Sequence, residues 1–206
     1  MPIKDFLRLP EAKQDEILNA ALKEFSFYGY DLASTNRIVA EAGISKGVLF
    51  KYFNNKESLF LFLIKKYLYE FNELSQVKRD YNDLFDYFIA KNNAEDDICD
   101  VHPKFRWCFI ALNKILNKPD HPVHKKALEY YYSYVDINID MVMSKLDENR
   151  LRDGITPADV REVIVFLING FRAMTHKDPE RTPAETEKLH QVEKLLISVA
   201  RNGIYK

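Results

Sequence analysis

Apolar residues recur at every third or fourth position through most of the chain, which is the spacing of one face of an α-helix. In the first third, this pattern predicts helices over about 10–28, 34–42, 45–53 and 56–74. Farther along, it predicts helices over about 81–92, 104–117, 123–146, 158–175 and 184–202. No segment alternates apolar and polar residues as a half-buried strand does, so the predicted fold class is all-α.

Breaks in the pattern predict where the helices end. The run "DDICDVHP", 96–103, is expected to be a loop, and Gly29 is expected to end the first helix. Ser34 and Ser45 each precede a short helix and suit its N-cap. The turn between these two helices is only "AGIS", 42–45, and a glycine-containing turn of this length is typical of a helix-turn-helix.

The second short helix is predicted to have an outer face that contacts a partner. Leu49 and Phe53 are four residues apart and share the side that packs inward. Gly47 and Lys51 fall on the opposite side, and Lys46 lies in the first turn. A glycine inside a helix costs about 1 kcal/mol relative to alanine. This cost is understandable where another surface must approach the helix backbone closely.

Charge adds to this interpretation. The whole chain has a net charge of −1, which excludes a globally basic nucleic-acid binder. Within 37–56 the net charge is +3, from four basic residues and one acidic residue: Arg37, Lys46, Lys51 and Lys56 against Glu41. Such a local basic surface attracts phosphates. An ordinary solvated helix face is the alternative, and charge and spacing alone favour neither.

A longer stretch carries a family resemblance. The segment "GYDLASTNRIVAEAGISKGVLFKYFNNKESLF", 29–60, resembles the N-terminal domain of the TetR family of bacterial transcriptional regulators. The positions that match the family pattern are Gly29, Tyr30, Ser34, Ile38, Ala42, Gly43, Ser45, Gly47, Leu49, Tyr52, Phe53, Lys56, Glu57 and Leu59. The resemblance covers roughly 10–60, and the remainder agrees only in being helical and of suitable length. It implies a DNA-binding domain over 1–55 and a helical ligand-binding and dimerisation domain over 56–206, joined by a long helix.

This resemblance implies a dimeric, ligand-responsive repressor of transcription. Two recognition helices would enter successive major grooves of a palindromic operator in double-stranded DNA. The residues expected at the DNA are Ser34, Thr35, Asn36, Arg37, Ser45, Lys46, Gly47, Val48, Lys51, Tyr52 and Lys56.

Roles follow from the family positions. Lys46 and Gly47 would face base edges, joined by Asn36, because lysine suits guanine and asparagine suits adenine. Phosphate contacts are implied for Thr35, Tyr52 and Lys56, and Lys51 suits either role. Four residues depart from the family pattern: Ala33, Val39, Val48 and Phe50. Phe50 lacks the hydroxyl of the usual tyrosine, so no phosphate contact is expected there, and Val48 is expected to touch a thymine methyl group instead of making a polar contact.

For the remaining two-thirds, the resemblance implies a small-molecule effector and a homodimer through the last two helices. The apolar faces of 158–175 and 184–202 suit that interface, although they suit an ordinary core as well. Gly170 would permit close helix approach. The residues predicted to line an effector pocket are Phe88, Trp107, Tyr131 and Phe166, with core packing as the alternative. A small apolar or aromatic effector would suit them, and so would one with a positive charge.

The sequence gives little support for metal binding, redox function or catalysis. The run 96–102 could resemble a metal site through Asp96, Cys99, Asp100 and His102, but none of the usual ligand spacings occurs. The pair His121 and His124 is interrupted by a proline, and a redox role for Cys99 and Cys108 has no electropositive setting. We therefore expect no metal, no cofactor and no catalytic residue. An all-helical metal-dependent enzyme with its site in 96–124 and a protein-only helical adaptor remain the alternatives.

The remaining composition predicts a soluble cytoplasmic protein with no membrane partner. Of the 206 residues, 47% are hydrophobic, which is enough to bury a core. Two cysteines do not make a disulfide framework. The start of the chain lacks a run of signal-peptide type, and the apolar stretch 163–170 is too short to span a bilayer.

Overall fold

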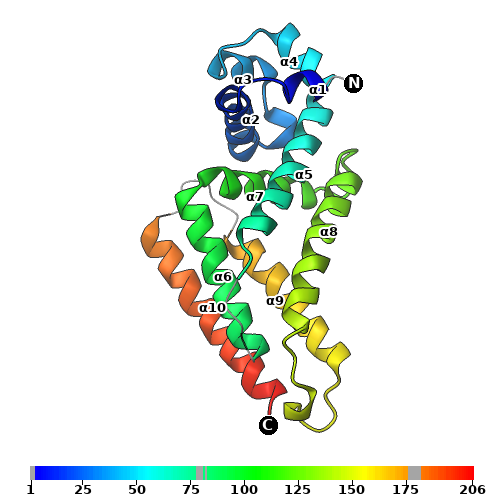
Figure 1. The fold of residues 1–206 in the computed structure, drawn as a ribbon, viewed down its shortest axis with the longest axis vertical. Helices are drawn as coiled ribbons and strands as arrows, with labels where there is room; N and C mark the ends of the chain where they lie inside the picture. The colour runs from blue at the N-terminus through cyan, green and yellow to red at the C-terminus, as the bar shows by residue number, and fades with distance from the viewer. Residues whose placement is uncertain (1–2, 78–80, 82, 176–181) are drawn as a thin grey trace. The chain divides into compact units, whose positions relative to one another are not determined.

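The protein is all-helical over the residues that the computed structural model describes, which are 3–77, 81, 83–175 and 182–206 (Figure 1). Its helices are α1 (Ile3–Phe6), α2 (Glu11–Leu32), α3 (Thr35–Glu41), α4 (Lys46–Phe53), α5 (Lys56–Leu74), α6 (Leu84–Val101), α7 (Pro103–Leu116), α8 (His124–Met143), the 3₁₀ helix η1 (Glu148–Arg150), α9 (Pro157–Thr175) and α10 (Pro183–Ile204). The predicted all-α class is confirmed. None of the helices in these ranges is long and apolar enough to cross a bilayer.

The prediction of a loop over 96–103 is wrong, because α6 continues to Val101. Its last turns bury Cys99, while Asp97 and Asp100 are exposed. The acidic residues thus occupy the solvent side of an amphipathic helix, and their number alone did not indicate a loop. Only His102 separates α6 from α7, and its backbone, with φ −126° and ψ 83°, is not helical, as expected before a proline that begins the next helix.

The short helix α1 was not predicted, because four residues carry too little periodicity. Gly29 does interrupt α2, as predicted: its φ is +70°, and one further turn follows to Leu32. Both predicted N-caps are confirmed. The Ser34 hydroxyl accepts a hydrogen bond from the Arg37 N–H, and the Ser45 hydroxyl accepts one from the Val48 N–H at 3.3 Å.

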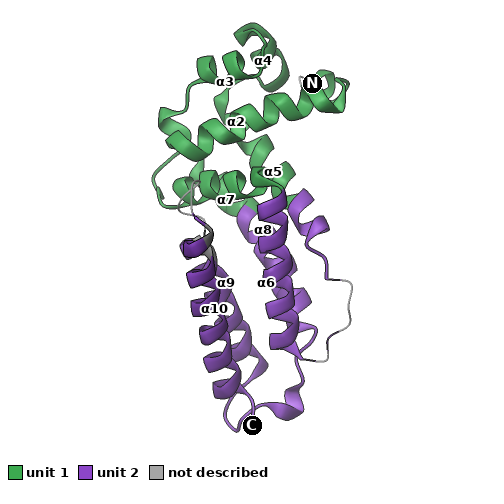
Figure 2. Ribbon diagram, turned by 90° about the vertical axis from the view of Figure 1, so that its left-hand side faces the viewer, with its two compact units in different colours: residues 1–69, 102–130 green, residues 70–101, 131–206 purple. Residues whose placement is uncertain are grey.

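The chain forms two compact units (Figure 2). Unit 1 comprises Met1–Tyr69 and His102–Tyr130, and unit 2 comprises Glu70–Val101 and Tyr131–Lys206. Unit 1 is therefore built from two separate stretches of chain. The functional division predicted from the sequence, 1–55 and 56–206, concerns which part meets DNA and stays a prediction.

The core of unit 1 is rich in aromatic side chains. The ring of Phe6 lies 4.9 Å from that of Phe53, and the ring of Phe25 lies 5.0 Å from that of Phe60. All four are buried. The first contact joins α1 to α4, and the second joins α2 to α5.

In unit 2, α10 packs against both α9 and α6. The rings of Phe88 on α6 and Phe171 on α9 are stacked with centroids 6.2 Å apart. A capping box begins α10: the Thr182 hydroxyl and the Glu185 carboxylate each satisfy the backbone N–H of the other residue.

Candidate functional site

The first part of the site is the pair of short helices α3 and α4. Ile38 on α3 and Leu49 and Phe53 on α4 are buried, as the helical spacing predicted. Gly43 lies in the turn between the two helices with φ +61°, a left-handed conformation that glycine adopts without strain. The result is a compact helix-turn-helix with one face of α4 directed away from its own core.

That outer face carries Lys46, Gly47 and Lys51, all exposed. A Cβ atom added at Gly47 would lie 3.9 Å from the Ser45 hydroxyl oxygen and would meet nothing closer. Nothing in the described part of the chain therefore requires a glycine there. The absent side chain leaves the backbone of α4 open to a surface from outside, flanked by two lysines.

Arg37 on α3 is held within the protein. Its Nε donates to both carboxylate oxygens of Glu24, at 2.9 and 3.0 Å, and its guanidinium lies 4.2 Å from the centre of the Tyr28 ring. The hydrogen bond to Glu24 raises the pKa of Arg37. Glu24 is buried and also accepts the Ser34 N–H at 2.7 Å. The charge of Arg37 is thus matched by Glu24, and the basic surface is smaller than the sequence count suggested.

Lys56 has partners in its own chain too. Its ammonium donates to the carbonyl oxygens of Asp31 and Ala33, at 3.2 and 3.1 Å, and lies 4.8 Å from the centre of the Tyr30 ring. These contacts close the C-terminal end of α2. The structure therefore gives Lys56 a definite role in positioning α2 against α5.

The other predicted DNA residues differ in exposure. Asn36 is exposed near the start of α3, whereas Thr35 and Val48 are half-buried. Tyr52 is half-buried, with its ring edge-to-face against Phe6 at 5.8 Å. The predicted residues thus share the helix-turn-helix, but only some of them present a side chain to the outside.

Two further residues that sequence reasoning missed fix the angle of α3. The Lys13 ammonium donates to the carbonyl oxygen of Ala42 at 2.9 Å, and Lys23 pairs with Glu41 at 3.2 Å. Both lysines are on α2, more than fifteen residues before their partners in sequence. No short motif marks such long-range pairs, although a lysine near the C-terminal end of a neighbouring helix is electrostatically favourable.

The far end of α2 is tied to α7. The Lys114 ammonium donates to the carbonyl oxygens of Ser26 and Phe27, the latter at 2.8 Å. The Asp31 carboxylate binds Lys118, and it also lies 2.9 Å from Nε2 of His121. Lys118 first, and then His121, lower the pKa of Asp31. These contacts attach the helix-turn-helix to residues that follow α6 in the chain.

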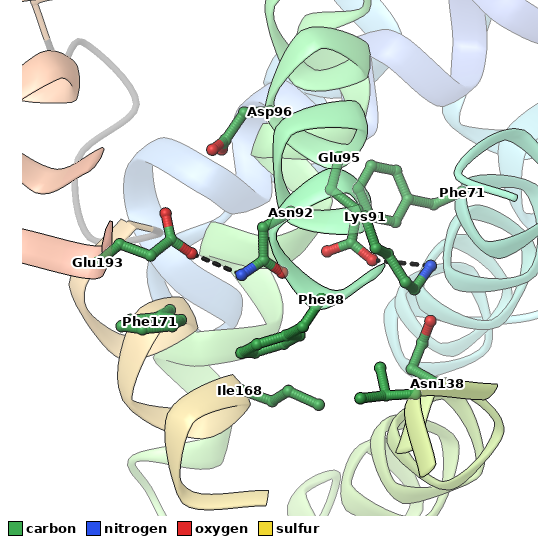
Figure 3. A pocket seen from close by; sticks show the side chains of 11 residues that line it. Phe71, Phe88, Lys91, Asn92, Glu95, Asp96, Asn138, Ile168, Phe171 and Glu193 are labelled. Carbon is green, nitrogen blue, oxygen red and sulfur yellow. Dashed lines mark hydrogen bonds and ion pairs between the residues drawn. The ribbon is translucent and has the colours of Figure 1, made fainter. Parts of the chain in front are cut away.

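Unit 2 contains the second part of the site, a cavity of about 40 Å³ between its helices (Figure 3). Phe71, Phe88 and Phe171 supply apolar walls. The polar lining residues are Lys91, Asn92, Glu95, Asp96, Asn138 and Glu193. A drug-sized ligand site usually has about 300 Å³ or more, so this cavity has room for an ion or a few waters as it stands.

Three carboxylates, those of Glu95, Asp96 and Glu193, line the cavity together with one ammonium, that of Lys91. The buried Lys91 ammonium lies 3.2 Å from a Glu95 oxygen and donates to the Ser75 hydroxyl at 3.1 Å. Figure 3 shows it directed away from Glu193. Burial, and then the charge of Asp96, raise the pKa of Glu193 to about 7. The lysine charge is therefore committed to Glu95.

The structure does not bring the four predicted pocket residues together. Phe88 lines the cavity, and the Tyr131 hydroxyl instead donates to the Asn169 side chain. Trp107 belongs to unit 1, and Phe166 is 77% exposed on α9. Of the four predictions, the cavity includes only that of Phe88.

The helices α9 and α10 both expose large apolar side chains. Leu195 is 63% exposed and Val199 is 62% exposed on α10, in addition to Phe166 on α9. A Cβ atom added at Gly170 would meet nothing within 4 Å. Apolar side chains of this size that remain uncovered on two neighbouring helices mark a surface suited to another protein chain.

The two cysteines are both buried. Burial raises the pKa of the Cys108 thiol, which keeps it protonated and unreactive. The structure thus offers no support for a thiol sensor at Cys108.

Comparisons with known proteins identify the helix-turn-helix. A family model described as "Bacterial regulatory proteins, tetR family" matches residues 17–63, which include α3 and α4. The HTH-type transcriptional repressor AcnR of Corynebacterium diphtheriae is 36% identical over 177 residues, or 83% of this chain and 84% of that repressor. The chain belongs to the TetR family. As a TetR-family protein it is a transcriptional regulator that binds operator DNA and dimerises, and not an enzyme.

The likeness extends along the whole TetR-family protein. AcnR of Corynebacterium glutamicum is 23% identical over 193 residues, or 93% of this chain and 94% of that repressor. A crystal structure of a TetR family transcriptional regulator from Chloroflexus aurantiacus has a TM-score of 0.68 at 20% identity and covers 100% of this chain and 99% of its own. At that identity the structure shows a shared fold. The alternatives of an all-helical enzyme and of a protein-only adaptor receive no support from these comparisons.

Proposed function

We propose that this TetR-family protein represses transcription by binding a palindromic operator as a dimer and that it releases the operator when an effector binds in unit 2. The observation that carries the DNA-binding part is the exposed Gly47 between Lys46 and Lys51. No packing among the described residues accounts for this glycine, and a base edge or a sugar–phosphate surface would use the space that it leaves. The relatives described above are repressors, which favours repression over activation.

The DNA contacts divide by what the side chains do in the protein. Lys46, Gly47 and Asn36 are exposed and suit base edges, as the family positions imply. Lys51 is exposed as well, 3.9 Å from Asp5, a weak pairing that a phosphate would readily replace. Arg37 and Lys56 contribute mainly by holding α3 and α2 in place, because their donors are already engaged.

Dimerisation is proposed to occur through α9 and α10. Phe166, Leu195 and Val199 supply the apolar area, and Gly170 leaves room for a partner helix. Two recognition helices held by such a dimer would meet half-sites about one helical turn of DNA apart.

The effector is proposed to enter among Phe71, Phe88 and Phe171. These side chains suit a small apolar or aromatic compound. A cavity of about 40 Å³ admits such a compound only if the lining helices move. Through such a movement of the lining helices, effector binding would change the affinity of the protein for DNA.

The operator claim is tested by selecting bound fragments from genomic DNA and measuring their affinity at fixed salt. Lys46→Ala is expected to weaken operator binding, while Lys125→Ala, which removes an exposed lysine of α8, is expected to leave it unchanged. The dependence of affinity on salt should also become shallower for Lys46→Ala if this side chain reaches a phosphate. Equal affinity of Lys46→Ala and the unaltered protein would contradict the docking through α4.

A further inference from the structure

Three side chains of types that can bind a metal lie close together in unit 2, and two of the three line the cavity. They are Asp96 on α6 and His190 and Glu193 on α10, and one ligand atom from each lies within 4.8 Å of the other two. His190 and Glu193 are three residues apart, which places them on the same face of α10. Figure 3 shows Asp96 and Glu193 on the same side of the cavity. The sequence analysis considered Asp96 with its neighbours in 96–102 and found no site, because its partners lie more than ninety residues farther along the chain.

The imidazole of His190 lies against the carboxylate of Asp96. Its Nε2 is buried and lies 2.6 Å from an Asp96 oxygen, and among the described residues it makes no hydrogen bond. This contact brings an imidazole nitrogen and a carboxylate oxygen to one point beside Glu193, whose own ligand atom lies within 4.8 Å of both. A cation at that point would satisfy both atoms.

Glu193 has the support that a metal-binding carboxylate usually receives. The Asn92 side-chain amide donates to a Glu193 oxygen at 2.7 Å, which orients the carboxylate and leaves its other oxygen available. The dashed line between Asn92 and Glu193 in Figure 3 marks this bond. The side-chain oxygen of Asn138, a residue that is 1% exposed, has no hydrogen-bond partner among the described residues. Figure 3 shows Asn138 on the side of the cavity away from Asp96 and Glu193, so this oxygen suits a water in the cavity and is not part of the three-residue group.

The geometry and the chemistry favour one class of ion. Metal–ligand bonds of about 2.0–2.2 Å place two ligand atoms of one ion at most about 4.4 Å apart, so small side-chain rotations suffice to close the site. One imidazole nitrogen and two carboxylate oxygens suit divalent first-row transition metals, whereas calcium sites use six to eight oxygens and Cu(I) sites use sulfur. A cavity of about 40 Å³ holds such an ion together with a water.

We propose that Asp96, His190 and Glu193 bind a divalent transition-metal ion, with Asn92 as the residue that positions Glu193. The ion joins α6 to α10 within unit 2. This site is additional to the DNA interface and to the proposed apolar effector, and neither is needed for it.

The test uses the full chain without a histidine tag, stripped with a chelator and titrated with Zn²⁺ by calorimetry and with Co²⁺ by visible absorption. One ion per chain is expected, with a rise in melting temperature that a chelator reverses. His190→Gln, Asp96→Asn and Glu193→Gln are each expected to weaken binding at least tenfold. Asn92→Ala is expected to weaken it about tenfold, as loss of a group that orients a ligand usually does.

Matched controls separate this site from the rest of the surface. Asp97→Asn changes the exposed neighbour of Asp96, and His124→Gln changes a histidine of unit 1, so both are expected to bind the ion as the unaltered protein does. Far-UV circular dichroism checks that each variant is folded. Absence of saturable binding below millimolar Zn²⁺, or binding by His190→Gln equal to that of the unaltered protein, would overturn the proposal. Operator affinity of the metal-free protein, measured in parallel, bears only on the proposed repressor function.

Discussion

Arg37 bridges both oxygens of Glu24 with its Nε while its guanidinium covers the ring of Tyr28. This arrangement fixes α3 on α2 through a carboxylate that is only 7% exposed. Because the same carboxylate accepts the N–H of Ser34, it also holds the residue that caps α3. The angle at which the helix-turn-helix leaves α2 therefore depends on one buried acid.

Glu24→Ala is expected to lower the free energy of unfolding by about 1.5–3 kcal/mol, because it leaves the Ser34 N–H without its charged acceptor. Urea denaturation followed by circular dichroism measures this change. Glu11→Gln, at an exposed position of α2, serves as the control and should change stability little. If the Glu24→Ala protein is as stable as the control, then the bonds of Glu24 to Arg37 and Ser34 do not contribute to stability.

Gly47→Ala is expected to change stability and DNA affinity in opposite directions. An alanine meets no neighbour closer than 3.9 Å and favours the helix by up to about 1 kcal/mol, so the melting temperature should rise. Operator affinity should fall, because the added methyl group occupies the space left for DNA. Thermal unfolding tests the expected rise in melting temperature, and gel-shift titration of the same preparation tests the expected fall in operator affinity. Unchanged affinity would exclude a close approach of DNA to this backbone.

Leu195→Glu is expected to convert the dimer to a monomer, because it places a charge on the exposed apolar surface of α10. Sedimentation velocity measures the change directly. Ile137→Glu introduces the same charge at a position of α8 that is 49% exposed and should leave the dimer intact. If Leu195→Glu also remains dimeric, then the interface lies elsewhere.

Asp31→Asn is expected to destabilise the protein near neutral pH and to have less effect in acid. The bonds to Lys118 and His121 lower the pKa of Asp31 in the folded protein. Its stabilising effect is therefore fully present above the unfolded value of about 4 and is lost as the pH falls through the lower folded value. Urea denaturation at several values between pH 3 and 7 tests this, with Asp120→Asn, at an exposed neighbouring position, as the control.

The features that the sequence predicted correctly are those that depend on interactions between residues close together in the chain. Ser34 and Ser45 could be assigned as N-caps because a cap needs only the next three residues. The buried positions Leu49 and Phe53 follow from helical spacing in the same way. The helix-turn-helix could thus be predicted almost completely.

What could not be predicted depends on residues that are distant in sequence. The carboxylate that neutralises Arg37 is thirteen residues earlier, and the carbonyl groups that engage Lys56 belong to the end of α2. Charge counting within 37–56 therefore overestimated the basic surface. The group of Asp96, His190 and Glu193 likewise exists only once α6 and α10 are packed.

The junction at His102 has a mechanical consequence. A single residue links the end of α6 to the start of α7. Residues of α6 line the cavity, and Lys114 of α7 donates hydrogen bonds to carbonyl groups of α2. One residue provides almost no slack, so an axial shift or rotation of α6 must be absorbed within α7 or passed along it. The direct junction thus limits how far the end of α6 can shift without displacing the start of α7, and this restraint comes from the covalent chain instead of from packing.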